Sequence, residues 1–139
     1  MSGFIDANAT ATLNFTQLVT GWGWLVRNGV SYVNASQDLS YSEGGFTLEK
    51  APRTAIGWNR DGSMVLLEID GEEDINAGPD LFEVAELLVS LGVDNAINLD
   101  GGGSSTSVED GNVINYPTCS DTSEKCERAV ASFTCVHKN

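Results

Sequence analysis

An aspartate, three glycines and three hydroxyl-bearing residues follow one another in the segment Asp100–Thr106. Residues 96–99 before it are mostly small or apolar, as is typical of a strand inside a sheet. Glycines let the main chain adopt positive φ and approach a ligand closely. Their N–H groups can cradle an anion, while Asp100 can act as a base, a nucleophile or an acceptor for a hydroxyl group. The spacing predicts a ligand or catalytic site at the end of this strand.

A flexible hairpin or linker is the alternative for the same residues, since Gly and Ser are typical of linkers. A linker has polar flanks, whereas this segment lies between an apolar stretch and a second alternating segment at residues 105–109. A phosphate-binding P-loop requires a lysine after its last glycine, and this segment has none. The glycine spacing does not fit the dinucleotide fingerprint either. Nucleotide binding is therefore not expected.

The chain carries a formal net charge of −13, from 20 acidic and 7 basic residues. Such a surface repels nucleic acid and anionic lipid over a Debye length of about 8 Å, so no nucleic-acid partner is expected. An anionic ligand would have to be met by local positive groups. The arginines available for this are Arg27, Arg53, Arg60 and Arg128.

The elements that must position these residues belong to one domain, because 139 residues with a hydrophobic fraction of 41% suit a single core. No apolar run reaches the roughly 18 residues of a membrane span, so no membrane segment is expected. Residues 1–14 lack the basic start and long apolar stretch of a signal peptide. We divide the chain into a polar lead-in, residues 1–20, and a domain, residues 21–139.

The domain is expected to be mixed α/β, a β-sheet of hairpins with one crossover helix. Pro79 and Asp80 open the helix, apolar residues recur in it at 3.6-residue spacing, and Gly92 closes it. Turn compositions at Asn28-Gly29 and Asp110-Gly111 predict hairpins. A helical turn is expected at residues 15–19 of the lead-in and a surface loop at residues 34–50. The expected strands are residues 21–26, 30–33, 53–58, 63–70 (a central strand), 95–99, 105–109 and 130–136.

Three features are expected to converge at one end of this sheet: Arg53-Thr54, Asp70-Gly71 and Asp100 with its glycines. The carboxyl end of a strand that follows a helix is a common place for a ligand. Arginine offers a fork of donors for phosphate or carboxylate, and two acids at strand ends suit glycoside chemistry. The alternatives are a surface ion pair for Arg53 and a simple turn for Asp70-Gly71.

The cysteines lie in the last part of the chain. A disulfide between Cys119 and Cys126 would close a short polar loop, and Cys135 would then be left over. A zinc site with Cys135 and His137 is disfavoured because the spacing fits no common structural site, so no metal is expected. Three glycosylation sequons, at Asn8, Asn14 and Asn34, fit a secretory-pathway protein.

Several of these segments together resemble a known family. They include Trp24 to Gly29, Arg53-Thr54-Ala55-Ile56-Gly57, Asp61-Gly62, Asp70-Gly71, Asn95 to Thr106, Tyr116-Pro117, Cys119 and Cys126, and Cys135-Val136-His137. From about residue 20 onward the chain is similar to the phosphodiester glycosidase domain of the N-acetylglucosamine-1-phosphodiester alpha-N-acetylglucosaminidases, the uncovering enzymes.

The resemblance implies a hydrolase that removes N-acetylglucosamine from a mannose 6-phosphate diester in the Golgi lumen, or outside the cell, without a cofactor. Asp100 and Asp70 would be the catalytic acids, and Arg53 and Thr54 would meet the phosphate. The remaining substrate-binding residues would be Asn98, Gly101, Gly102, Gly103, Ser104 and Ser105. Which acid is the nucleophile, the general acid or the base does not follow from the motif.

The departure from the family is length, because its glycosidase domain is about twice as long as this chain. The chain resembles the C-terminal half of that domain, so a missing N-terminal half is expected as a partner. A non-catalytic carbohydrate- or phosphate-binding module that uses the same glycine loop is the rival interpretation. A third is calcium binding by Glu72, Glu73, Asp74 and Asp80, for which a solvated acidic turn is the simpler explanation.

Overall fold

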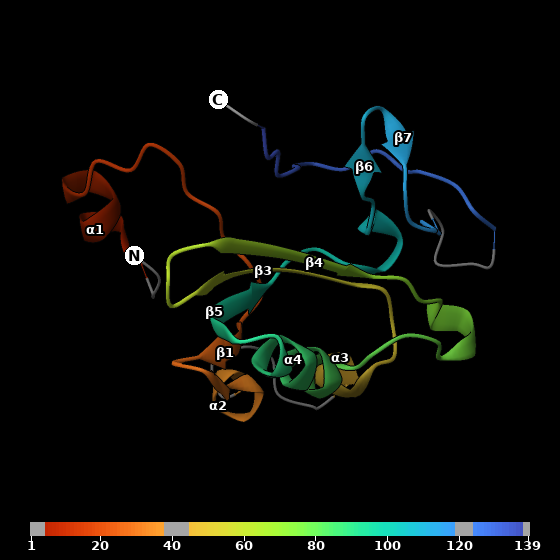
Figure 1. Cartoon of the computed structure of the whole chain (residues 1–139), viewed down its shortest axis with the longest axis horizontal. Helices are drawn as coiled ribbons and strands as arrows, with labels where there is room; N and C mark the ends of the chain where they lie inside the picture. The colour runs from red at the N-terminus through yellow and green to blue at the C-terminus, as the bar shows by residue number, and fades with distance from the viewer. Residues whose placement is uncertain (1–4, 38–44, 119–123, 138–139) are drawn as a thin grey trace.

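A five-stranded sheet with helices against one of its faces forms the centre of the computed structural model, which describes residues 5–37, 45–118 and 124–137. Helices α2, α3 and α4 lie on one side of the sheet, and the small hairpin of β6 and β7 lies on the other (Figure 1). The strands are β1 Trp24–Arg27, β2 Val30–Ser31, β3 Arg53–Asn59, β4 Met64–Ile69, β5 Val93–Asn98, β6 Val108–Glu109 and β7 Asn112–Val113. The helices are α1 Ala7–Thr12, α2 Val33–Gln37, α3 Gly45–Leu48 and α4 Leu81–Ser90, with 3-10 turns η1 Glu73–Ile75 and η2 Gly102–Ser104.

The strand order is β2-β1-β5-β3-β4, and every neighbouring pair is antiparallel. Since β4 and β5 are both antiparallel to β3, they run parallel to each other, and α4 connects them as a crossover over β3. The carboxyl ends of β4 and β5 therefore lie at the same end of the sheet as the amino ends of β3 and β1. This topology brings residues near positions 22, 53, 70 and 100 to the same end of the sheet. It confirms the predicted mixed α/β fold.

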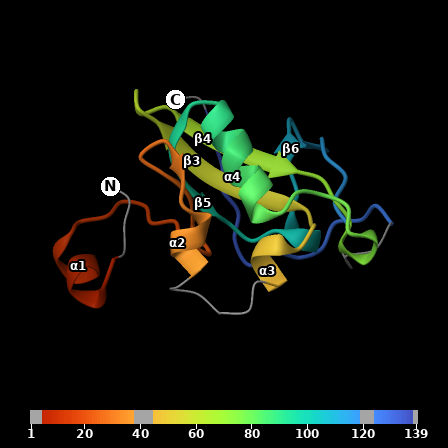
Figure 2. The ribbon, with the colours of Figure 1, turned by 90° about the horizontal axis from the view of Figure 1, so that it is seen from below.

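Helix α4 packs the main core against the sheet (Figure 2). Asp80 caps its first turn in a capping box with Glu83, and Gly92 beyond its end has φ of 82°, as predicted from the sequence. Its buried face meets small strand residues, which let the helix lie close to the sheet. The fully buried members of this core are Leu25, Val26, Val33, Ala55, Leu81, Val84, Ala85, Leu88, Val93 and Ala96.

Both predicted turns join antiparallel strands. Asn28 and Gly29 have φ of 54° and 75°, and Asp110 and Gly111 have 48° and 78°. Positive φ at both central residues is the signature of a type I′ turn, which explains the Asn-Gly and Asp-Gly sequences. The hairpins β1/β2 and β6/β7 are therefore confirmed.

Strand β4 is an edge strand, although its apolar run predicted a central one. Leu66 and Met64 are 44% and 43% exposed on its open face. The central position belongs to β5, whose composition is less apolar, because the crossover inserts it between β1 and β3. Burial of the other face accounts only for Val65, Leu67 and Ile69, which pack against the core.

The least patterned segments differ most from expectation. The lead-in helix is α1, capped by Asp6, and not a turn at residues 15–19. The expected loop at residues 34–50 holds α2 and α3, which are short and gain their stability from packing on α4 and β1. The described residues of 130–136 form no strand and are exposed, so the predicted strand there is wrong.

Candidate active site

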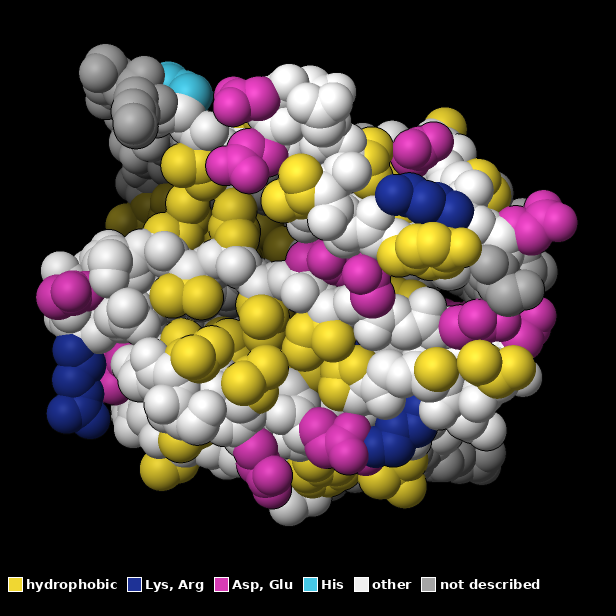
Figure 3. All heavy atoms as spheres, turned by 45° about the vertical axis from the view of Figure 1, so that its right-hand side comes forward, with side chains coloured by type: hydrophobic (Ala, Val, Ile, Leu, Met, Phe, Trp, Pro, Cys, Tyr) yellow, Lys and Arg dark blue, Asp and Glu magenta, His cyan; other side chains and the backbone are white. Residues whose placement is uncertain are grey.

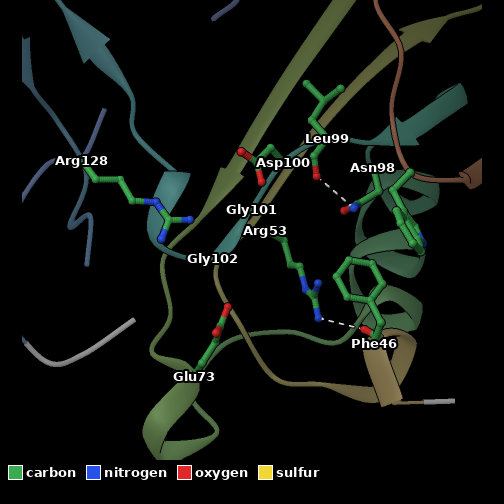
Figure 4. Close-up of a pocket in the computed structure, with 10 residues that line it drawn as sticks. Phe46, Arg53, Glu73, Asn98, Leu99, Asp100, Gly101, Gly102 and Arg128 are labelled. Carbon is green, nitrogen blue, oxygen red and sulfur yellow. Dashed lines mark hydrogen bonds between the residues drawn. The ribbon is translucent and has the colours of Figure 1, made fainter. Parts of the chain in front are cut away.

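A pocket of about 420 Å³ opens at the end of the sheet where β5 gives way to the glycine loop (Figure 4). Its wall comes from six separate parts of the chain. The lining residues are Trp22, Phe46, Arg53, Glu73, Asn98, Leu99, Asp100, Gly101, Gly102 and Arg128. The pocket therefore contains five of the ten residues that the sequence assigned to a site.

The glycine loop is fixed against the start of β3. The Gly102 N–H donates to the Pro52 carbonyl over 2.9 Å, and Gly102 itself has φ of 54°. A Cβ at position 101 would lie 2.8 Å from the same carbonyl oxygen, so only glycine fits there without displacing the main chain. The linker interpretation is therefore wrong: the loop is a packed turn.

Asp100 lies on the rim of the pocket and is exposed. Within residues 5–37, 45–118 and 124–137, its carboxylate has no hydrogen bond or ion pair. Structural carboxylates in this chain are used differently: Asp80, for example, caps α4 and pairs with Lys50. A carboxylate with no structural partner at the mouth of a pocket is available for chemistry.

The amide cradle expected from the glycines is largely absent. The N–H groups of Gly102, Ser104 and Ser105 donate to carbonyl oxygens of Pro52, Gly101 and Gly102. The loop forms the 3-10 turn η2, in which the main chain satisfies its own donors. Binding of an anion at this pocket must therefore rely mainly on side chains.

Asn98 is buried, with 2% of its surface exposed, and it lines the pocket. Its Nδ2 donates to the Leu99 carbonyl over 3.0 Å, while its Oδ1 is buried without a partner among the described residues. Leaving a buried acceptor unsatisfied costs about 1–3 kcal/mol. A ligand hydroxyl or amide N–H in the pocket would satisfy this oxygen.

Arg53 is 3% exposed and so is not a surface residue, although its Nη2 also lies 4.0 Å from the Glu49 carboxylate. Its Nη2 donates to the carbonyls of Phe46 and Glu49 over 3.1 and 2.6 Å, and its guanidinium lies 4.8 Å from the centre of the Phe46 ring. Nε makes a longer contact of 3.5 Å to the Pro79 carbonyl. Arg53 therefore holds segments 46–49 and 79 together as one wall of the pocket.

Burial lowers the pKa of the Arg53 guanidinium from its usual value, and the carboxylates of Glu49, Glu73 and Asp80 act in the opposite direction. Arginine stays charged in proteins, so the cation persists inside the wall. The site thus carries a positive charge that solvent screens poorly.

Thr54 and Ser105 meet behind the loop, where their hydroxyl groups lie 3.2 Å apart. Thr54 follows Arg53 in β3 and so points to the opposite face of the sheet. The Thr54 carbonyl also accepts from the Leu99 N–H over 2.8 Å. Neither Thr54 nor Ser105 is a lining residue of the pocket, so the structure assigns them to the support of the loop.

Asp70 lies at the same end of the sheet but does not line the pocket. Its Oδ1 accepts from Asn115 Nδ2 over 3.1 Å and from the Tyr116 N–H over 2.8 Å. Asn115 also donates to the Ser105 carbonyl and accepts from the Ser107 N–H. Asp70 is therefore tied to the far side of the glycine loop, apart from the pocket that Asp100 borders.

Glu68 is an acid in this cluster that the sequence analysis missed. Its Oε1 is buried without a hydrogen bond among the described residues. Burial raises its pKa to about 7, and the nearby Asp70 carboxylate adds to the effect. The signal in the sequence was an acid inside an apolar strand, two residues before Asp70.

Glu68→Gln should flatten the pH dependence of stability between about pH 4.5 and 7. The folded pKa of Glu68 lies above its unfolded value of 4.5, so the native state binds the proton more tightly and ionisation destabilises it as pH rises through this window. Thermal unfolding from pH 4 to 8 measures the effect. An unchanged slope in the variant would contradict the assignment, and Glu86→Gln on the exposed side of α4 is the control.

Trp22, Phe46, Glu73 and Arg128 are further pocket residues that the site assignments omitted. Trp22 and Phe46 form a tilted aromatic pair with ring centres 5.4 Å apart. Trp22 lies in the expected strand 21–26 and Phe46 in the expected loop 34–50, and they meet because β1 begins at this end of the sheet. No spacing rule in the sequence connects them.

Cys135 is exposed and carries a free thiol. Cys119 lies outside the described residues, so its pairing with Cys126 stays a prediction. Among the residues that are described, no group of three His, Cys, Asp or Glu side chains is placed to hold a metal ion. No described helix is long and apolar enough to cross a membrane.

Thiol labelling of the oxidised chain should find one reactive cysteine, at position 135. Cys119 and Cys126 are seven positions apart and flank a polar loop, so they should pair with each other. Intact-mass analysis followed by peptide mapping measures the result. A bond from Cys135 to either of the others would contradict the prediction, and the reduced chain with three labels is the control.

The fold is thus a mixed α/β domain with an acid and a glycine loop at the carboxyl end of its central strand. A family model described as phosphodiester glycosidase matches residues 3–137. The chain belongs to this family.

Individual relatives agree. The bovine and human N-acetylglucosamine-1-phosphodiester alpha-N-acetylglucosaminidases are 42% and 43% identical over 133 residues, which is 89% of this chain in each case. The chain spans about a quarter of the length of these relatives, 25% and 26%.

Solved structures give the same result for the fold. The zebrafish catalytic domain of that enzyme, described as auto-inhibited by its pro-peptide, matches with a TM-score of 0.78 and 36% identity, covering 87% of this chain and 42% of that one. A hypothetical protein from Synechocystis matches with a TM-score of 0.56 and 30% identity, covering 72% of this chain and 18% of that one.

Proposed function

We propose that the pocket hydrolyses the bond between N-acetylglucosamine and phosphate in a phosphodiester. The observation that carries the proposal is Asp100, a carboxylate that has no partner in the described part of the chain and lies at the mouth of a pocket with aromatic and cationic walls. The relatives named above support the substrate class. Because the chain spans a quarter of their length, the activity is a proposal for this pocket and not an established property of the chain.

The walls suit the two halves of such a substrate. Trp22 and Phe46 present aromatic surface against which the apolar face of a sugar ring can pack. The unpartnered Asn98 Oδ1 can accept from a sugar hydroxyl or from the acetamido N–H. The buried charge of Arg53 favours the phosphate.

The reaction breaks the bond between the anomeric carbon and the phosphate oxygen, and water supplies the hydroxyl that replaces it. Asp100 acts at the anomeric carbon, as nucleophile or as base for that water. The departing phosphate takes the bonding electron pair. Phosphate is a good leaving group, so stabilisation of its charge contributes more than its protonation.

The remaining assignments belong to the same proposal. Asp70 is the proposed second acid, and its position at the same end of the sheet supports this role. Asn98, Gly101, Gly102, Gly103 and Ser104 are proposed to contact substrate, with Thr54 and Ser105 acting through the loop that they support.

We propose that the product is mannose 6-phosphate on a glycan, exposed for lysosomal sorting within the secretory pathway. The names of the relatives support a bond between N-acetylglucosamine and phosphate as the one that is cleaved. The sequon residues Asn8, Asn14 and Asn34 are all exposed, as glycosylation in that compartment requires.

The test is release of free N-acetylglucosamine from N-acetylglucosamine-phospho-α-methylmannoside by the full chain. Hydrolysis that disappears in Asp100→Asn is the expected result. Saturable binding of the diester with no release of sugar would overturn the catalytic proposal and favour the rival, a non-catalytic binding module.

A further inference from the structure

A second guanidinium, that of Arg128, lines the pocket and contacts the glycine loop. Arg128 comes from the extended C-terminal segment, 24 residues from Ser104, and its side chain reaches back to the loop. Its Nε and Nη2 donate to the same Ser104 Oγ over 3.1 and 2.9 Å. In Figure 4, Arg128 and Phe46 lie on opposite sides of the pocket.

Other candidates for an anion contact are already used. Three of the loop amides donate within the protein, and Arg53 directs Nη2 and Nε at main-chain carbonyls. Lys50 pairs with Asp80 and Glu83. Arg60 pairs with Asp94 at the opposite end of the sheet. At a net charge of −13, a phosphate group needs a directed cationic partner.

The contact between Arg128 and Ser104 is suited to exchange. Two guanidinium donors share one hydroxyl oxygen, whereas the two oxygens of a phosphate match the spacing of that fork one for one. Arg128 is exposed and lines the pocket, so a ligand there can reach its guanidinium. The Ser104 hydroxyl then becomes a further donor to the same phosphate.

We propose that Arg128 is the residue that binds the phosphate of the substrate and makes the pocket selective for phosphorylated sugars over neutral ones. This rests on the proposed function, whose phosphodiester supplies the anion. Arg53 contributes fixed positive charge from within the wall, and Arg128 supplies the directed hydrogen bonds. The sugar then lies toward Phe46 and the phosphate toward the loop.

The test compares binding of two ligands to the full chain by calorimetry: N-acetyl-α-glucosamine 1-phosphate and the neutral methyl N-acetyl-α-glucosaminide. The wild type should prefer the phosphorylated sugar by about tenfold or more. Arg128→Gln should remove most of this preference, leaving only the part that the fixed charge of Arg53 supplies, with the affinity for the neutral sugar unchanged. Arg128→Lys keeps the charge but loses the paired guanidinium donors, so it should retain only part of the preference for the phosphorylated sugar.

Arg60→Gln is the matched control, because it removes the same charge from an exposed arginine at the other end of the sheet. It should keep the wild-type preference. The proposal would be overturned if Arg128→Gln kept the wild-type preference for the phosphorylated sugar. It would also be overturned if Arg60→Gln lost as much of this preference as Arg128→Gln.

Titration with inorganic phosphate separates this inference from the proposed function. Failure of the wild type to bind either sugar, with phosphate binding that is lost in Arg128→Gln, would reject the sugar phosphodiester as substrate and support Arg128 as the anion site. If the wild type and Arg128→Gln bind phosphate equally well, and also bind the phosphorylated sugar equally well, Arg128 is not the anion site. The proposed function would not be affected by that result.

Discussion

Asp100→Asn is expected to lower the rate of hydrolysis by about 10²–10⁴-fold, the range found when a general base or acid is lost. The substitution removes the charge at nearly constant shape. The loop that holds position 100 is fixed by Gly101, Gly102 and the Pro52 carbonyl, none of which depends on the carboxylate. The measurement is kcat/KM for release of N-acetylglucosamine from the phosphodiester.

The same variant should unfold within about 0.5 kcal/mol of the wild type, because the carboxylate is exposed and has no partner among the described residues. Asp110→Asn is the control for charge: it lies at a positive-φ turn position that asparagine also tolerates. Turnover close to wild type in Asp100→Asn would remove Asp100 from the catalytic site.

Arg53→Lys is expected to destabilise the fold by about 2–4 kcal/mol, since hydrogen bonds from a charged donor contribute about 1.5–3 kcal/mol each. A lysine ammonium cannot reach the carbonyls of Phe46 and Glu49 while also lying over the Phe46 ring as the planar guanidinium does. Hydrolysis should fall with it, because the wall that carries Phe46 loses its support. Urea unfolding and kcat/KM measure the two effects.

Arg60→Lys is the comparison, since the Arg60 side chain is 81% exposed and its ion pair contributes little. It should change stability by less than about 0.5 kcal/mol. Equal stability and activity of Arg53→Lys and the wild type would show that the buried contacts of Arg53 have no energetic weight.

Features that depend on neighbouring residues could be predicted from the sequence. Asn28-Gly29 and Asp110-Gly111 fix their turns through positive φ, and Asp80, Glu83 and Gly92 fix the ends of α4. Apolar periodicity located β3, β4 and α4, and the helix between two strands placed Asp100 at a sheet end. These are local effects of backbone conformation and hydrophobic spacing, which act without the rest of the fold.

Which distant groups share the pocket depends on the folded chain. Trp22, Phe46 and Arg128 come from three distant segments, and the fold brings them together around Asn98 and Asp100. The fold also buries Arg53, which donates to main-chain carbonyls, and places Asp70 where it accepts from Asn115 and Tyr116.

The physical reason is that hydrogen bonding and desolvation of a polar group depend on what the whole chain packs around it. Arginine and aspartate have the same sequence signature whether they face solvent, a carbonyl or a ligand. Packing also decided the short helices α2 and α3, which are too short to be stable by their own propensity. Loop glycines were visible in the sequence, but the use of their amides within η2 was settled by the folded turn.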